Sequence, residues 1–180
     1  MTRELIIAGF GGQGVMAMGK MLIEAGLKEN YHVSWVPSYG PEMRGGTANC
    51  SVVISDEPIG SPVVTQPNEL IVMNNPSLSR FEPLMEEGGL MLINSSHVEQ
   101  TPKRRDLDIR FVPCMEEANR IGNPKVANMV MLGAYIAATG AVKMDTVKEM
   151  LGAVFHGSKE HLEDLNIQAL EAGAKYISRN

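Results

Sequence analysis

Two glycine-rich segments carry most of the residues that could do chemistry. Residues 9–14 read GFGGQG, and residues 38–46 read SYGPEMRGG. Glycine lets a ligand approach the main-chain N–H groups at a helix start closely. The guanidinium of Arg44 is a planar fork that suits a carboxylate or a phosphate. Both segments are therefore candidate surfaces for binding an anion or another protein.

The first segment has the pattern of a dinucleotide-binding turn. The G-x-G-x-x-G fingerprint is satisfied by Gly9, Gly11 and Gly14, between an expected strand and an expected helix. A standard NAD or FAD site also needs an acidic residue at the end of the second strand. Residues 36–38 read VPS and contain no acid. The missing acidic residue thus disfavours a standard dinucleotide site.

Two interpretations of this turn stay open. It is either a tight connection without a ligand, or a turn that meets an anion or the backbone of a partner protein. Gln13 is the side chain in the turn that can make directed hydrogen bonds. The candidate contact residues are Gly11, Gly12, Gln13 and Gly14.

The second segment combines residue types that are common at protein interfaces. An exposed Glu42–Arg44 pair would contribute at most about 1 kcal/mol, which does not by itself explain such a segment. Tyrosine, methionine and arginine are enriched at interfaces. One interpretation is a β-turn connection with solvated charges. The other is a rigid surface that presents Tyr39, Glu42, Met43 and Arg44 to another molecule.

The remaining reactive residue types do not form a catalytic or metal-binding pattern. The histidines are scattered, at positions 32, 97, 156 and 161. Cys50 and Cys114 lack metal-ligand spacing, and an iron–sulfur cluster usually needs four cysteines. We expect no metal site and no catalytic residue in this chain. Reduced cysteines are typical of a cytoplasmic protein.

Composition excludes several classes of partner. The formal net charge is -5, and the basic run KRR at 103–105 is short, so a nucleic-acid surface is not expected. Apolar runs fall short of membrane-spanning length, so we expect no membrane association. Thirteen methionines are an unusual number, and methionine fills irregular core gaps or adapts to partner surfaces.

Hydrophobic periodicity predicts the elements that position these segments. Apolar, β-rich runs predict strands over 4–9, 31–37, 47–55, 69–74, 88–94 and 108–113. Helical spacing predicts helices over 15–30, 76–86, 114–121 with 125–139, 143–155 and 159–178. Residues 126–139 are apolar nearly all round, which places this helix in the interior or at an interface. Asn128 within it would contact a loop or fill a packing gap.

The order of these elements predicts an α/β fold. Strand–helix–strand units over the first 40 residues and over 69–94 are typical of helices on the faces of a sheet. The strands at 31–37 and 47–55 have no helix between them, which favours a mixed, mostly parallel sheet. We expect a single three-layer domain over 1–180, with a Rossmann-like first strand–turn–helix. The helices from about residue 114 would pack on the sheet.

Several segments together carry a family resemblance. AGFGGQGV, VSWVPSYGPEMRGGTANCSVVIS and DEPIGSP, with the helix NMVMLGAYIAATG at 128–140, resemble the gamma subunit of the 2-oxoacid:ferredoxin oxidoreductases. The similarity covers essentially the whole chain. The segment at 38–46 favours the 2-oxoglutarate type over pyruvate enzymes, with branched-chain 2-oxoacids as the next candidate.

The resemblance implies a non-thiamine subunit of a hetero-oligomeric enzyme. Such an enzyme converts 2-oxoglutarate, coenzyme A and oxidised ferredoxin to succinyl-CoA, CO2 and reduced ferredoxin. It uses thiamine diphosphate, Mg²⁺ and iron–sulfur clusters, which the resemblance assigns to other subunits. The partners would be thiamine-binding alpha and beta subunits and a ferredoxin-like subunit, with ferredoxin as acceptor. The glycine turn and Arg44 would then contact coenzyme A or a partner subunit, and the chain alone would be inactive.

Two other functions stay open. An independent Rossmann-like nucleotide-binding protein would use Gly9, Gly11 and Gly14 to bind NAD, FAD or an adenine nucleotide. A free-standing regulatory or scaffold homodimer would use the methionines and the apolar helix. For a gamma subunit separated from its partner subunits, a homodimer also stays open.

Overall fold

The computed structural model describes residues 1–38, 47–154 and 160–179. Its strands are β1 (Thr2–Phe10), β2 (His32–Ser38), β3 (Thr47–Ser55), β4 (Glu69–Val72), β5 (Leu90–Asn94) and β6 (Asp108–Val112). Its helices are α1 (Val15–Lys28), α2 (Asn75–Phe81), α3 (Cys114–Ile121), α4 (Ala127–Thr139), α5 (Met144–Val154) and α6 (Glu160–Arg179). Short 3₁₀ helices are η2 (Glu82–Leu84) and η3 (Pro124–Val126).

The strands form one six-stranded sheet of order β2-β3-β1-β4-β5-β6. The pairs β1–β4, β4–β5 and β5–β6 are parallel, and β3 is antiparallel to both β1 and β2. The sheet is therefore mixed and mostly parallel, as the order of elements predicted. β3 lies between β1 and β2, so the two strands that α1 connects are not neighbours in the sheet.

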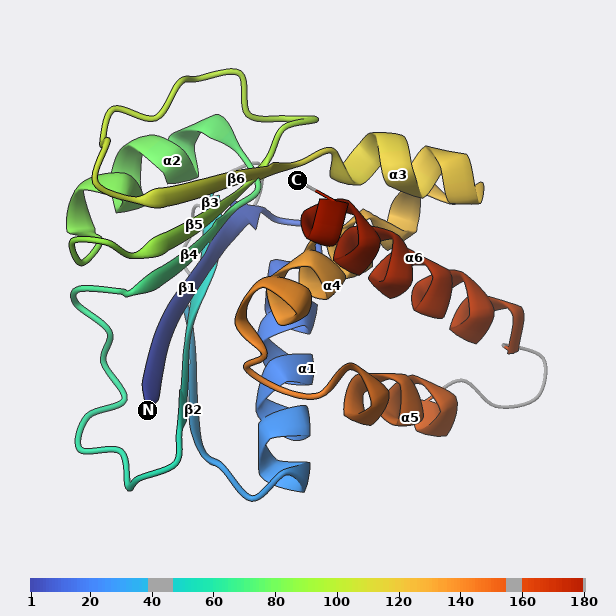
Figure 1. Ribbon diagram of the computed structural model, residues 1–180, viewed down its shortest axis with the longest axis horizontal. Coiled ribbons are helices and arrows are strands. Elements are labelled where there is room, and N and C mark those ends of the chain that lie inside the picture. Colours follow the sequence, from blue (N-terminus) through green and yellow to red (C-terminus); the bar gives the residue numbers. More distant parts are fainter. Residues whose placement is uncertain (39–46, 155–159, 180) are drawn as a thin grey trace.

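Helices cover both faces of the sheet (Figure 1). On one face, a stripe of α1 that includes Val15, Met18 and Leu22 packs with α3, α4, α5 and α6 in one hydrophobic cluster. On the other face, Leu78 and Phe81 of α2 pack over β1, β4 and β5 in a second cluster. This arrangement confirms the predicted α/β fold with helices on both sides of a sheet.

The apolar helix α4 lies in the interior. All its residues from Met129 to Ile136 are buried, because α6 covers one side and the sheet layer the other. Gly133 and Gly173 lie where α4 and α6 cross. A Cβ atom on Gly133 would collide with the backbone of Leu170, and one on Gly173 with the backbone of Val130. The two helices are therefore held at backbone contact distance.

A buried ion pair ties α4 to the sheet at the edge where β1 begins. Arg3 on β1 pairs with Glu69 on β4, and the hydroxyl of Tyr135 donates to Glu69 over 2.5 Å. Arg3 also donates to the carbonyl of Thr139 over 2.5 Å. Removing one member would leave a buried charge without a partner, which is strongly destabilising. These contacts orient α4 relative to the parallel strands.

The predicted boundaries of the strand at 69–74 and of the helix at 76–86 were wrong for identifiable reasons. The strand predicted over 69–74 ends at Val72, because the Asn74 side chain caps α2 by accepting a hydrogen bond from the Ser77 N–H over 3.0 Å. The helix predicted over 76–86 accordingly ends its α-helical part at Phe81 and continues as η2. Gly122, at a φ of 98°, ends α3, so α3 and α4 are separate helices.

None of the helices in the described ranges is long and apolar enough to cross a membrane.

Candidate functional site

A pocket opens where the helices after β1 and β4 leave the sheet in opposite directions. α1 follows β1 on one face, and α2 follows β4 on the other. In open α/β sheets, ligands bind beside the carboxyl ends of the strands at such a switch point. The cavity has a volume of about 160 Å³. It is lined by Gly12, Gln13, Gly14, Met73, Asn94, His97, Met115, Pro124, Lys125, Ala127 and Asn128.

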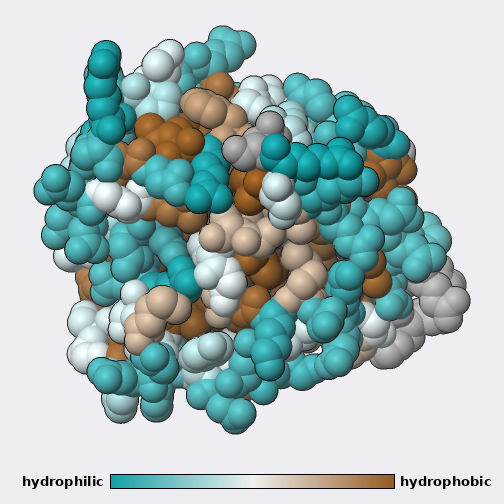
Figure 2. Space-filling model, viewed as in Figure 1, coloured by the Kyte–Doolittle hydropathy of each residue, from teal (hydrophilic) through white to brown (hydrophobic). Residues whose placement is uncertain are grey.

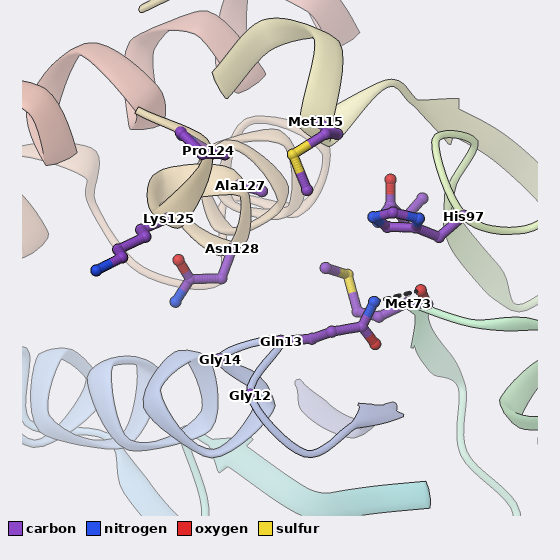
Figure 3. A pocket seen from close by; sticks show the side chains of 11 residues that line it. Gly12, Gln13, Gly14, Met73, His97, Met115, Pro124, Lys125, Ala127 and Asn128 are labelled. Carbon is purple, nitrogen blue, oxygen red and sulfur yellow. Dashed lines mark hydrogen bonds between the residues drawn. The ribbon is translucent and has the colours of Figure 1, made fainter. Parts of the chain in front are cut away.

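Gln13 fixes the floor of this pocket. Its Oε1 accepts a hydrogen bond from the Phe10 N–H over 2.7 Å, and its Nε2 donates to the Met73 carbonyl over 3.1 Å. Figure 3 shows the second bond crossing from the glycine turn to the residue that follows β4. The directed hydrogen bonds expected of Gln13 are thus made within the protein. Gln13 positions the turn at the pocket floor.

Gly14 lets α1 begin directly beneath α4. Its φ of 75° lies in the left-handed region, and a Cβ atom there would overlap the side chain of Asn128. No side chain caps the start of α1, and its first turn contains no acidic residue. The first N–H groups of α1 therefore lie beside the pocket with the positive end of the helix dipole. Asn128 contacts this turn.

The opposite wall comes from the segment after β5 and the start of α3. His97 and Met115 lie across the cavity from Asn128 (Figure 3). The Ser96 hydroxyl accepts a hydrogen bond from the Met115 N–H over 2.9 Å and donates one to Glu116. The bond from Ser96 holds the pKa of the Glu116 carboxyl below its usual range, with a smaller contribution from the nearby His97. Ser96 and Glu116, which do not line the pocket themselves, thus hold the start of α3 and Met115 in position.

The pocket suits a small anionic or polar group. The start of α1 supplies partial positive charge. Lys125 belongs to the lining and has no ion-pair partner among the described residues, and its side chain extends away from Gln13 and His97 in Figure 3. Drug-sized ligands usually occupy cavities of about 300–1,000 Å³. A cavity of about 160 Å³ admits a phosphate-sized group or one partner side chain, but not a whole dinucleotide.

The strand order also disfavours a standard NAD site. In a Rossmann fold, the strand that carries the ribose-binding acid lies directly beside the first strand. Here β3 separates β2 from β1, which places the end of β2 roughly 10 Å from the turn. Val36, Pro37 and Ser38 at that end offer no carboxylate. Sequence and topology therefore agree on this point.

The structure places only part of the predicted site. Gly12, Gln13 and Gly14 line the pocket, and Gly11 lies exposed in the same turn. Tyr39, Glu42, Met43 and Arg44 fall outside the described residues. The described flanks of that segment are Ser38 and Thr47. Thr47 pairs with Phe10, so β3 begins at the same sheet edge as the glycine turn.

Sequence reasoning missed several pocket residues. Asn94, His97 and Met73 follow or end parallel strands, and Lys125 precedes α4. The signal that could have found the first three was their position, because the carboxyl ends of parallel strands meet at one sheet edge. No local pattern indicated Lys125, since its place depends on how α4 crosses the sheet.

The residues present do not fit an iron–sulfur cluster. Cys50 and Cys114 are both fully buried, and burial raises the pKa of the Cys50 thiol to about 11. Burial also raises the pKa of Cys114, with a smaller effect from Glu116. A cluster needs several accessible thiolates. Within the described part of the chain, no group of three or more His, Cys, Asp or Glu residues could hold a metal ion.

Residues 4–176 match the family model for pyruvate ferredoxin/flavodoxin oxidoreductase. The chain belongs to this family. Two similar relatives come from Methanothermobacter marburgensis. Ketoisovalerate oxidoreductase subunit VorA is 42% identical over 97% of this chain, but the match covers 36% of VorA. 2-Oxoglutarate synthase subunit KorC is 34% identical over 98% of this chain and 97% of its own length.

A solved structure has the same fold over nearly its full length. It is the gamma subunit of keto/oxoacid ferredoxin oxidoreductase from Geobacter sulfurreducens, with a TM-score of 0.83 and 28% identity. The match covers 99% of both chains. The family resemblance that the sequence segments indicated is thereby confirmed at the level of the oxidoreductase family. VorA and KorC are named for different 2-oxoacids, so the specific substrate of this chain's complex stays a prediction.

Proposed function

We propose that this chain is the non-thiamine gamma subunit of a hetero-oligomeric 2-oxoacid:ferredoxin oxidoreductase. The observation that carries the proposal is the alignment with KorC, which spans nearly the whole of both chains. The two buried cysteines support it, because the clusters would then belong to companion chains. The complex would oxidise and decarboxylate a 2-oxoacid and transfer the acyl group to coenzyme A.

The pocket at the glycine turn is the proposed contact with coenzyme A or with a partner subunit. Its volume fits one phosphate group of coenzyme A, and the start of α1 and Lys125 would favour an anion there. Arg44 would add a planar cation from the segment between β2 and β3. The thiamine diphosphate, its Mg²⁺ and the iron–sulfur clusters would be held by the alpha, beta and ferredoxin-like subunits.

We propose 2-oxoglutarate as the substrate of the complex, with ketoisovalerate as the second candidate. KorC supports the first, because its match extends over 97% of its length. VorA supports the second through its higher identity of 42%. Substrate choice depends mostly on the thiamine-binding chains. The test is to co-express all subunits and compare viologen reduction with 2-oxoglutarate, ketoisovalerate and pyruvate.

The role of the pocket has its own test within that complex. Lys125→Ala and Arg44→Ala should each raise the apparent KM for coenzyme A or weaken subunit assembly. Lys28→Ala is the matched control, because Lys28 is an exposed lysine at the opposite end of α1. Unchanged assembly and unchanged KM in both variants would remove the pocket from the proposal. The family assignment would not be affected.

An independent nucleotide-binding protein is the alternative. It predicts that the isolated chain binds NAD, FAD or an adenine nucleotide, which titration calorimetry would detect. The small cavity and the interposed β3 argue against it.

A further inference from the structure

Among the described residues, no hydrogen bond is made by the outward main-chain groups of β6, the last strand of the sheet. The Asp108 N–H donates inward to Gly89 over 2.9 Å, and the Val112 carbonyl accepts from the Ser95 N–H over 3.0 Å. Main-chain groups alternate in direction along a strand, so those of Ile109 and Phe111 point outward. β6 is the last strand of the sheet, and no other described strand pairs with this edge.

The side chains along this edge are only partly covered. Phe111 is 47% exposed, and Asp108 and Arg110 form an ion pair of 2.7 Å whose side chains are 50% and 38% exposed. Figure 2 shows hydrophobic atoms at the surface over the position of β6 in Figure 1.

The opposite edge of the sheet is formed by β2. This strand contains Pro37, which has no N–H to donate to a new strand. The two edges therefore differ in their capacity to pair.

We propose that β6 pairs in antiparallel fashion with β6 of a second copy of this chain, about a two-fold axis at Ile109. In this register, Asp108 of each copy lies opposite Arg110 of the other. The outward N–H and C=O groups of the two Ile109 residues then face each other and form a hydrogen-bonded pair. Opposite charges directly across two strands stabilise a pairing, and this register contains two such pairs. The edge is therefore complementary to itself.

The neighbouring registers are less favourable. An axis at Arg110 would place two arginines opposite each other, and like charges at that position are destabilising. An axis at Phe111 would place Ile109 opposite Pro113, which has no N–H to donate. Charge and hydrogen bonding thus select the axis at Ile109. Because five residues make a short edge, we expect a reversible dimer with a dissociation constant on the order of micromolar.

Charge exchange between two copies gives the sharpest test. Arg110→Asp would place two pairs of aspartates opposite each other in a dimer, and Asp108→Arg would place two pairs of arginines. Each variant alone should dissociate about tenfold more readily than the wild type in sedimentation velocity over a concentration series. An equimolar mixture of the two should restore dimers, because each copy then meets opposite charges. A change confined to one chain cannot produce that rescue.

A second variant removes a hydrogen bond without altering charge. Ile109→Pro deletes the outward N–H at the centre of the proposed pairing and leaves the ladder to β5 intact. It should also abolish dimers, with circular dichroism confirming a folded chain. A wild-type chain that stays monomeric at all concentrations would overturn the proposal. So would dimers that persist in Ile109→Pro, or a mixture that fails to rescue the charge variants. The proposal does not depend on the proposed enzymatic function.

Discussion

Gln13 donates a hydrogen bond from Nε2 to the main-chain carbonyl of Met73 over 3.1 Å. This bond joins the turn after β1 to the residue after β4, across the point where their helices diverge. Its other amide atom, Oε1, accepts from Phe10 over 2.7 Å. The side chain therefore holds the pocket floor in one shape before any ligand or partner arrives.

Replacing Gln13 tests this positioning role. Gln13→Ala removes both hydrogen bonds and leaves the Phe10 N–H and the Met73 carbonyl without these partners. We expect a loss of about 1–3 kcal/mol in the free energy of unfolding, measured by urea denaturation. Gln66→Ala is the control, because Gln66 is exposed and should change stability by less than about 0.5 kcal/mol. Equal stability of the two variants would contradict the role given to Gln13.

Gly14 should not accept a side chain. Gly14→Ala forces an alanine to a φ of 75° and pushes its Cβ against Asn128, so we expect about 1–3 kcal/mol of destabilisation. Gly60→Ala is the matched control, since a Cβ atom added at Gly60 would meet no other atom within 4 Å and its φ is not positive. Thermal unfolding followed by circular dichroism compares the two. The double variant with Asn128→Ala should recover the part of the loss caused by overlap. Full recovery would show that backbone strain is unimportant.

The crossing of α4 and α6 depends on Gly173. Gly173→Ala would drive a Cβ into the Val130 carbonyl, and neither helix can shift without disturbing the core, so we expect a loss of more than about 2 kcal/mol. Gly152→Ala, within α5, meets only the flexible end of Glu163 at 3.0 Å. That control should be neutral or stabilising by up to about 1 kcal/mol, because alanine favours helix. Chemical denaturation of both variants checks the contrast, which a similar loss at both positions would contradict.

The Cys50 thiol gives a prediction for pH. Burial raises its pKa to about 11 from a usual value of 9.0. The protonated form therefore contributes stability that is fully present below about pH 9 and is lost as pH rises through 11. At pH 8 the native thiol should resist iodoacetamide and react only when urea opens the core. Thr65→Cys supplies an exposed control that reacts at once. Rapid labelling of native Cys50, detected by peptide mass spectrometry, would contradict its burial.

Much of the fold followed from local patterns. The strand at 4–9 and the helix beginning at Val15 were predictable, because an apolar run, a glycine turn and a helical stripe succeed each other. The mixed sheet followed from the missing helix between 31–37 and 47–55. The end of β4 at Val72 was not predicted, since the cap that Asn74 provides competes with strand continuation. Local propensity does not decide between those two outcomes.

The site was less accessible to sequence reasoning. The glycines of the turn carry a recognisable pattern, so Gly12, Gln13 and Gly14 were found. His97 and Lys125 come from segments that approach the turn only after β5 and α4 take their places in the tertiary structure. Asn128 was noticed as a polar residue in an apolar helix, but its contact with Gly14 depends on the helix crossing. Long-range packing therefore determines these pocket contacts, which hydrophobic periodicity could not predict.

The most direct test of the central claim is reconstitution. The proposed alpha, beta and ferredoxin-like partner subunits are purified with and without this chain, and viologen reduction is measured with 2-oxoglutarate and coenzyme A. We expect no turnover from this chain alone, a stable complex on addition, and activity dependent on coenzyme A only when all subunits are present. Turnover by the isolated chain, or full activity of the other subunits without it, would contradict the account.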